Sequence, residues 1–143
     1  MIKPDGVQRK LVGEVIRRFE NRGLKLCGLK MQLASPELLH QHYAEHEGRP
    51  FFQKLLDYVG SGPVAAMVWE GGNAIEIGRK LVGATKPLES APGTIRGDFC
   101  LDVGKNLIHG SDSAESAARE IGLWFTAEEI VAWEDHTTSW IYE

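Results

Sequence analysis

Apolar residues recur at the spacing of a helix near the start of the chain. Four of them share one helical face: Val12, Val15, Ile16 and Phe19. Charged residues occupy the opposite face, and Asn21-Arg22-Gly23 supplies the residue types that end helices. The pattern predicts an amphipathic helix from residue 12 to about residue 20. Residues 1–6 are expected to be an extended stretch that ends in a Pro-Asp-Gly turn.

Two segments further along have the patterns of strands. Residues 24–33 partly alternate between apolar and polar, and residues 64–69 form a continuous apolar run that is typical of a buried strand. Between them, Ser35 is a good N-cap for a helix that runs to about residue 46, and a second short helix is predicted over 51–59.

The second half of the chain continues the alternation of helices and strands. Its predicted segments are a helix from Asn73, as N-cap, to Val82, a long ordered loop over 85–98, a short strand over 107–109, a helix from Asp112 or Ser113 to about Phe125 and a short helix opened by the capping box Thr126–Glu129. The order β-α-β-α-α-β-α-loop-β-α fits a single α+β domain over residues 1–143, with four strands and helices on one face of the sheet.

Composition narrows the functional classes. The chain is 43% hydrophobic and 25% charged, which is ordinary for a globular domain, and its net charge of −4 does not indicate nucleic-acid binding. No apolar run has the length of a membrane span, and no targeting segment is visible. The two cysteines, Cys27 and Cys100, form no CxxC pair and indicate free thiols in a reducing compartment. We therefore expect a cytoplasmic protein.

One heptapeptide, Asn106–Asp112, carries the strongest chemical signal. It places His109 at the end of an apolar run, before a glycine and a helix-starting Ser-Asp, so the imidazole would stand on rigid backbone at the mouth of a cleft. Histidine can carry a covalent intermediate, although most single histidines have no chemical role. Glu120, eleven residues further on the next helix, would return beside His109 and orient it, with Ser111 holding Glu120. The alternative is an exposed helix glutamate.

Cationic and polar residues next to turns suggest a site for phosphate. They are Lys3, Arg79 and Arg96, with a hydroxyl from Thr85 and a carboxamide from Asn106. Arginine matches phosphate oxygens in a bidentate way and lysine acts as a point charge, but each residue alone is more often a solvated surface group. His42 and His46 lie four residues apart, yet no HExxH motif or cysteine accompanies them, so a metal site there is disfavoured.

Five motifs, in order along the whole chain, resemble the signatures of the nucleoside diphosphate kinase family. They are Lys3-Pro-Asp-Gly-Val-Gln-Arg, Ser61-Gly-Pro-Val, Met67-Val-Trp-Glu-Gly, Pro92-Gly-Thr-Ile-Arg-Gly-Asp-Phe and Asn106-Leu-Ile-His-Gly-Ser-Asp. The resemblance implies a ferredoxin-like α+β sandwich, with a four-stranded antiparallel sheet and helices packed on it.

The same resemblance implies the reaction and the roles of residues. The γ-phosphate of a nucleoside triphosphate, mainly ATP, would pass to His109 and then to a nucleoside diphosphate in a ping-pong cycle. Glu120 and Ser111 would orient His109. The residues implied to bind the nucleotide are Lys3, Tyr43, Phe51, Leu55, Arg79, Thr85, Arg96, Val103 and Asn106. Mg²⁺ would be the cofactor, held mainly by the phosphates and not by protein ligands.

The two ends of the chain add further expectations. Family members carry an apolar strand before the Lys-Pro-Asp-Gly motif, whereas only Met1 and Ile2 precede Lys3, so a truncated first strand is predicted. The tail to Glu143 and the loop with Pro87 resemble those of eukaryotic members that assemble as hexamers, and a homohexamer is expected. The alternative function is a non-catalytic interaction or nucleic-acid-binding scaffold of the same fold. Phosphohistidine transfer to other proteins would use the same chemistry.

Overall fold

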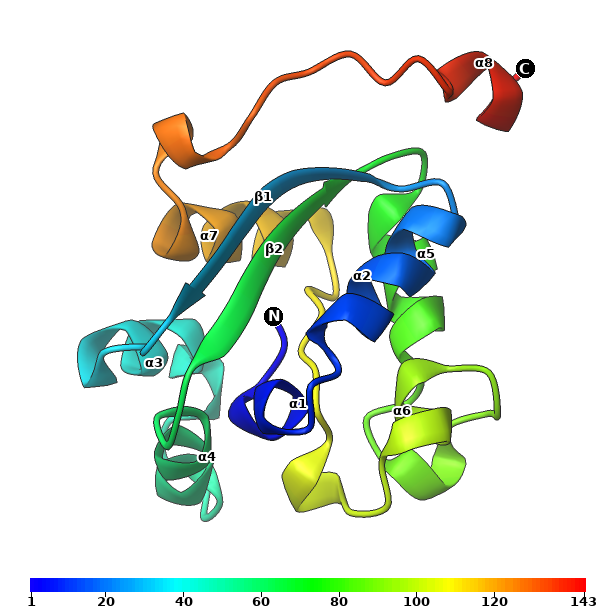
Figure 1. The fold of residues 1–143 in the computed structure, drawn as a ribbon. Helices are drawn as coiled ribbons and strands as arrows, with labels where there is room; N and C mark the ends of the chain where they lie inside the picture. The colour runs from blue at the N-terminus through cyan, green and yellow to red at the C-terminus, as the bar shows by residue number, and fades with distance from the viewer.

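A computed structural model describes residues 1–143 (Figure 1). The helices are α1 (Pro4–Gln8), α2 (Val12–Asn21), α3 (Pro36–His42), α4 (Phe52–Val59), α5 (Ala74–Val82), α6 (Ile95–Phe99), α7 (Ala114–Trp124) and α8 (Thr138–Ile141). The strands are β1 (Lys25–Gln32) and β2 (Val64–Glu70). Short 3₁₀ turns lie at Ala44–His46, Pro87–Glu89, Val103–Lys105 and Ala127–Glu129. None of the helices combines the length and apolar character that crossing a membrane requires.

Several helix ends follow directly from local sequence. The side chain of Ser35 accepts a hydrogen bond from the backbone N–H of Leu38, so α3 begins where its N-cap was predicted. Ser113 and Ser116 form a reciprocal capping box at the start of α7, and Thr126 and Glu129 form another further on. The predicted N-cap at Ser35 and the predicted capping box at Thr126–Glu129 are confirmed, and of the two predicted starts of α7 the structure selects Ser113 as the N-cap.

The sheet has two regular antiparallel strands, β1 and β2. β1 and β2 pair from Lys25 opposite Glu70 to Gln32 opposite Val64, with an irregularity between Leu26 and Gly28. Ile2 extends this ladder as a single residue, since it bridges Ala65 on one side and Ile108 on the other. The segments around Ile2 and Ile108 therefore lie beside β2 without forming regular strands.

A tight turn explains why the predicted strand over residues 107–109 is reduced to one bridge. The N–H of Ile108 donates to the carbonyl of Asn106 at 2.8 Å, and Leu107 between them has a φ of 69°. This is a γ-turn of the rare positive-φ type, which is strained for a residue with a branched side chain. Leu107 is fully buried, so its packing holds the backbone in this conformation immediately before His109.

Helices cover both faces of the sheet, not one face as predicted. The alternation of side chains along β2 sends Val64, Ala66 and Val68 into one apolar cluster and Ala65 into another. The first cluster lies against residues of α3, α4 and α7, and the second against residues of α2, α5 and α6. Figure 1 shows these two groups of helices on opposite sides of the strands. Both faces of β2 are therefore buried.

Four other local predictions need correction. Residues 4–8 form α1, because proline is well suited to the first turn of a helix. The long loop over 85–98 ends in α6, which Thr94 caps. Asn73 adopts a left-handed conformation and makes no side-chain cap. The helix that begins at Pro36 ends at His42 and continues only as a 3₁₀ turn.

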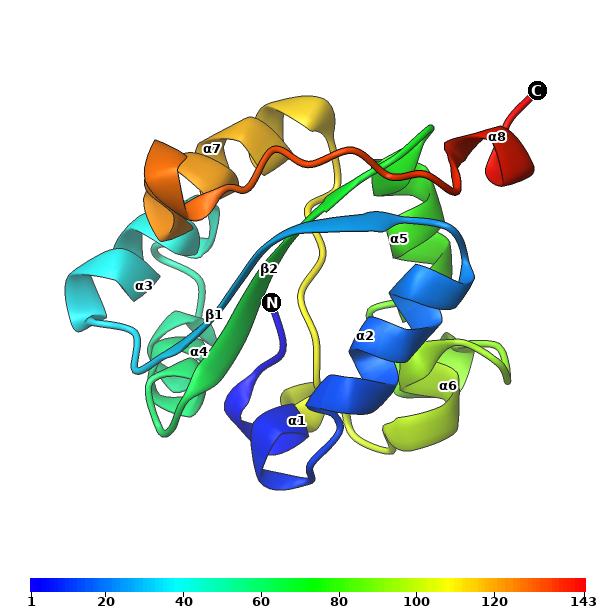
Figure 2. The same ribbon diagram turned by 45° about the horizontal axis from the view of Figure 1, so that its top comes forward.

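The aromatic tail packs across β1, as Figure 2 shows. The N–H of Val131 donates to the carbonyl of Cys27 at 2.8 Å, and the indole of Trp133 donates to the carbonyl of Leu26 at 2.9 Å. Near the end of the chain, the hydroxyl of Tyr142 accepts a hydrogen bond from Gly72. These contacts tie the tail to the edge of the sheet.

Candidate active site

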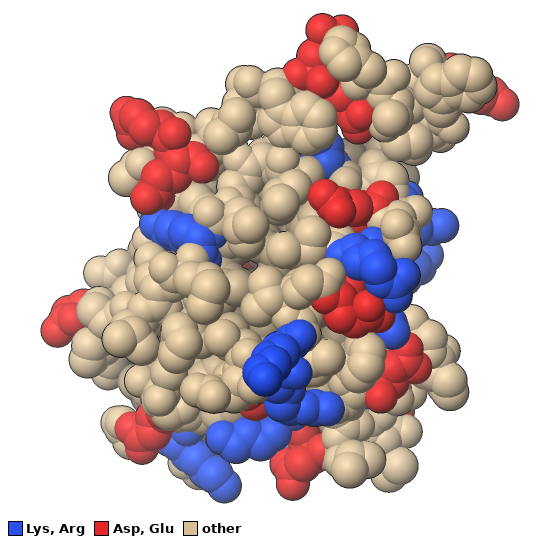
Figure 3. Space-filling view, viewed as in Figure 1, with Lys and Arg blue, Asp and Glu red and all other residues tan.

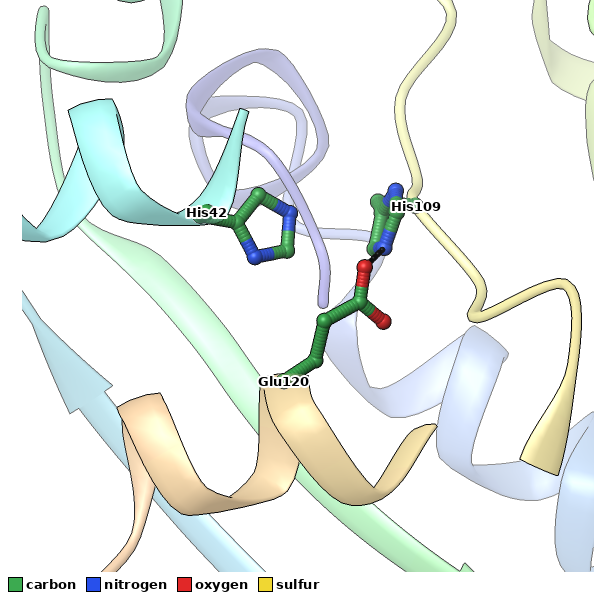
Figure 4. Close-up of side chains that lie close together, drawn as sticks. All are labelled: His42, His109 and Glu120. Carbon is green, nitrogen blue, oxygen red and sulfur yellow. Dashed lines mark hydrogen bonds and ion pairs between the residues drawn. The ribbon is translucent and has the colours of Figure 1, made fainter. Parts of the chain in front are cut away.

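The structure brings His109, Glu120 and Ser111 into one hydrogen-bonded group, of which Figure 4 shows His109 and Glu120. Nε2 of His109 lies 2.8 Å from Oε1 of Glu120, and the hydroxyl of Ser111 donates to the other carboxylate oxygen. Because α7 begins shortly after the 109–112 segment, with Ser113 as its N-cap, its second turn carries Glu120 back beside the histidine. The return that the sequence suggested is therefore present in the fold.

Electrostatics set the protonation of this pair. Burial alone would raise the pKa of Glu120, but hydrogen bonds from His109 and Ser111 outweigh it and lower that pKa to about 2. Burial lowers the pKa of His109 below its ordinary 6.5, and the bond to Glu120 opposes this only in part. His109 is therefore a neutral imidazole at pH 7. Since Glu120 can only accept, the proton lies on Nε2, and Nδ1 keeps a free lone pair.

Two arginines fix the backbone on which His109 stands. The guanidinium of Arg96 is buried and donates to the carbonyls of Ile108 at 2.6 Å, Asn106 at 3.2 Å and Gly83 at 3.3 Å. Arg79, which is exposed, donates to the carbonyl of Gly110 at 3.2 Å. Burial lowers the pKa of Arg96, which nevertheless remains charged in proteins. Arg96 thus holds the residue before His109, and Arg79 holds the residue after it.

A third cation reaches this region through the amide of Asn106. Nζ of Lys3 is buried and donates to Oδ1 of Asn106 at 2.7 Å, and Nδ2 of Asn106 donates to the carbonyl of Thr85 at 3.3 Å. Burial and the charge of Arg96 lower the pKa of Lys3 to about 8. Three of the residues implied to bind nucleotide are therefore linked in one hydrogen-bonded chain.

Aromatic side chains extend from His109 toward the surface. The ring of Tyr43 lies 6.3 Å from that of His109 and 6.3 Å from that of His46, which in turn lies 5.4 Å from Phe51. Tyr43 is buried, its hydroxyl has no partner, and burial raises its pKa. Phe51 is 47% exposed, which leaves a ring face open for stacking.

Two predicted residues are not joined to this group by any described contact. Leu55 is half-buried on α4 and packs against the apolar cluster that includes Val64. Val103 begins a 3₁₀ turn and is 56% exposed. An apolar cavity of about 150 Å³ does border His109 and Glu120, but Lys3, Arg96 and Asn106 do not line it. Of the cations suited to phosphate, only Arg79 lines this cavity.

His42 belongs to the site and was not predicted from the sequence. It ends α3, is almost fully buried, and its ring centroid lies 4.5 Å from that of His109. His42, His109 and Glu120 place potential ligand atoms within 4.8 Å of one another. However, Nδ1 of His42 accepts a hydrogen bond from Trp124 at 2.9 Å, so a metal on Nε2 would require an imidazolate. The group is therefore poorly suited to a metal, and His46 is not part of it.

Charges of both signs are mixed on the face seen in Figure 3. Lys and Arg gather over its lower part, with Asp and Glu between them. A continuous basic surface, as nucleic-acid binding would need, is not formed on this face.

Comparisons with known proteins show the family of this chain. A sequence profile described as nucleoside diphosphate kinase matches residues 1–130. The chain is 61% identical to human nucleoside diphosphate kinase 3 over 142 residues, which are 99% of this chain and 84% of that protein. It is 60% identical to a nucleoside diphosphate kinase of Thermosynechococcus vestitus, with 99% of this chain and 95% of that protein covered.

Solved structures agree with the sequence comparisons. A halophilic nucleoside diphosphate kinase from Halobacterium salinarum, in complex with CDP, superposes with a TM-score of 0.97 at 51% identity. A family protein from Babesia bovis gives 0.96 at 54% identity, and each alignment covers 99% of this chain and 95% of the other. The chain belongs to the nucleoside diphosphate kinase family, and it is an enzyme.

Proposed function

We propose that this enzyme transfers the γ-phosphate of a nucleoside triphosphate to a nucleoside diphosphate through a phosphohistidine on His109. The observation that carries the proposal is the bond between Nε2 of His109 and Glu120, because it leaves the lone pair of Nδ1 free on a neutral ring. The lone pair of Nδ1 forms a bond to the γ-phosphorus as the bond to the β-bridging oxygen breaks. That oxygen leaves with the electron pair on the nucleoside diphosphate, and the second half-reaction reverses the step with another diphosphate.

The neighbouring residues supply what phosphoryl transfer requires. The ring gains positive charge as Nδ1 attacks, and ionised Glu120 stabilises that charge through the proton on Nε2. Lys3, Arg79 and Arg96 would neutralise the phosphate oxygens, and Tyr43, Thr85 and Asn106 would donate to phosphate or ribose. Phe51, with Leu55 and Val103, would contact the base through a ring face, which tolerates any nucleobase.

Mg²⁺ enters this proposal as part of the nucleotide substrate. The carboxylate of Glu120 is occupied by His109 and Ser111, and that of Asp112 by Ser116. The residues around His109 therefore offer cations and amides rather than free carboxylates for the hard cation. We propose that the phosphates hold Mg²⁺ and that the ion offsets their charge during transfer.

We also propose that the sheet is a ferredoxin-like sheet of four strands. Its order would be β1, β2, the segment at Ile2 and the segment at Ile108, all antiparallel. The bridges from Ile2 to Ala65 and to Ile108 support this order, as does the N–H of Lys3, which donates to the carbonyl of Leu107 at 2.8 Å.

We also propose that the chain assembles as a homohexamer and that it is located in the cytoplasm. Leu88, next to Pro87, is 97% exposed, and Trp140 in the tail is 89% exposed, as expected of surfaces that a neighbouring subunit covers. Both cysteines are free and buried, which supports a reducing compartment. Light scattering after gel filtration would give the mass of six chains, whereas a monomer mass contradicts the assembly.

The reaction is tested by incubating the purified chain with Mg²⁺ and γ-labelled ATP beside His109→Ala. We expect label that is acid-labile, stable to alkali, absent from the variant and discharged by GDP. Circular dichroism would show that both proteins are folded. A folded wild-type protein that takes up no label would contradict the proposed reaction and favour the scaffold.

A further inference from the structure

His42 has a donor that no acceptor satisfies, and this donor points at the proposed nucleophile. The indole N–H of Trp124 donates to Nδ1 of His42 at 2.9 Å, in a fully buried contact. An indole nitrogen can only donate, so Nδ1 must supply its lone pair and the proton of neutral His42 must lie on Nε2. Trp124 thus selects the tautomer of His42.

Burial keeps His42 in this neutral form. Burial and then the charge that His109 can carry lower the pKa of His42 to about 3. Nε2 has no hydrogen-bond partner, although unpaired polar groups are rare in protein interiors. The proton on Nε2 therefore needs some other electron-rich neighbour.

The ring of His109 is that neighbour. The two rings are nearly perpendicular, with centroids 4.5 Å apart and planes at 76°. Figure 4 shows His42 turned so that one nitrogen points at His109, whose ring is seen edge-on. This is the arrangement of an N–H donor directed at the face of an aromatic ring.

We propose that His42, held as the Nε2–H tautomer by Trp124, is a positioning residue that holds the ring of His109 and disfavours positive charge on it. The inference rests on the proposed role of His109 as phosphate acceptor. The positive end of the N–H attracts the electrons of a neutral imidazole and repels an imidazolium. Attack by Nδ1 produces a phosphorylated ring that is cationic while Nε2 keeps its proton. His42 therefore raises the free energy of the phosphoenzyme and favours onward transfer to a diphosphate.

Other charged groups also act on His109, and replacement of His42 leaves them in place. Glu120 favours a positive charge on His109, whereas Lys3 and the amine of Met1 oppose it. Arg119, on the same helix as Glu120, lies near His42 and donates to its carbonyl. Differences between variants at His42 would therefore report on its N–H rather than on these groups.

The test compares His42→Phe with His42→Gln. Phenylalanine keeps a flat ring without a donor, whereas glutamine can place an N–H near the position of Nε2. Each protein is equilibrated with mixtures of Mg·ATP and Mg·ADP, and intact-mass spectrometry gives the phosphorylated fraction. We expect His42→Phe to reach half-phosphorylation at an ATP:ADP ratio about two- to fivefold below that of the wild type, and His42→Gln to stay close to it. The pKa of His109, followed by NMR, should rise in His42→Phe.

A role in packing alone predicts the opposite ranking, because glutamine fills the ring-shaped space less well than phenylalanine. That ranking, or an unchanged ratio in both variants, would overturn the inference. His40→Phe is the matched control, since His40 is an exposed residue of the same helix. A wild-type protein without any phosphoenzyme would instead contradict the proposed reaction.

A measurement on the unmodified chain covers the case in which His42→Phe does not fold. Long-range proton–nitrogen NMR correlations distinguish the two neutral tautomers of histidine. We expect His42 to be the Nε2–H tautomer throughout pH 5 to 9, and an Nδ1–H tautomer or an imidazolium would overturn the inference.

Discussion

Nη2 of Arg96 donates to the carbonyl of Ile108 at 2.6 Å, and Ile108 directly precedes His109 in the chain. The same guanidinium bonds the carbonyl of Asn106, so it spans the strained turn at Leu107. Arg96, which the resemblance implies to bind phosphate, therefore also fixes the backbone before the proposed nucleophile. We call this pair of hydrogen bonds, to Asn106 and Ile108, the clamp. Substitution of Arg96 should affect both stability and transfer.

Arg96→Met keeps an unbranched apolar stem and removes all donors. Three carbonyls each lose a hydrogen-bond donor, and those of Ile108 and Gly83 lose the donor described for them, so the free energy of unfolding should fall by about 2–4 kcal/mol in urea denaturation. The rate of phosphoenzyme formation should fall about 100-fold, because charge stabilisation is lost and His109 is less fixed. Arg17→Met is the control, since Arg17 is exposed and solvent screens its pair with Glu14, so its replacement should leave the stability almost unchanged. Equal stability losses in both variants would contradict the clamp.

Glu120→Gln removes the negative charge of the carboxylate and keeps the shape of the side chain. The amide keeps a hydrogen bond to His109 but cannot balance the positive charge that forms on the ring, so kcat should fall about 100-fold with little change in KM. Steady-state kinetics with ATP and GDP measure both constants. Ser111→Ala removes only a support of Glu120 and should reduce kcat several-fold. A loss confined to KM in Glu120→Gln would place the carboxylate in binding instead.

The sequence predicted the long elements well because local signals define them. The apolar periodicity of α2, the Ser35 cap of α3 and the Ser113 cap of α7 act within one or two turns, so no tertiary information was needed. The strand predicted at 107–109 forms only one bridge, because the γ-turn there depends on the burial of Leu107 and on the clamp by Arg96. These contacts come from distant parts of the chain.

The part of the site that lies close to His109 in the sequence could be predicted, whereas the part contributed by a distant helix could not. The motif around His109 and the following helix pointed to Glu120 and Ser111, because the spacing along one turn and helix limits where they can lie. His42 left no such signal, since its place depends on the packing of α3 against α7 and on Trp124, 82 residues away. Contacts of that range are visible only in the folded chain.

Activity should have a bell-shaped dependence on pH. The nucleophile is neutral His109, whose pKa lies below 6.5, so kcat/KM should decline as the pH falls through that region. Phosphate binding needs charged Lys3, so kcat/KM should decline again as the pH rises through about 8. Lys3→Gln should lower the plateau and abolish the alkaline decline while leaving the acid one. An alkaline decline that persists in Lys3→Gln would assign it to another group.

Phe51→Ala should weaken nucleotide binding without changing the choice of base. Phe51 is 47% exposed and makes its described ring contact with His46 at 5.4 Å, so its loss removes a stacking surface and not a core contact. Stacking on an aromatic ring contributes roughly 1–3 kcal/mol, which corresponds to a rise in KM of about 5- to 150-fold for every diphosphate tested. Steady-state kinetics with ADP, GDP, CDP and UDP would measure the change, and Phe51→Trp would restore most of the affinity because the ring face is kept. A large KM effect for one base alone would show that Phe51 reads base identity, and an unchanged KM for all four would remove it from the binding site.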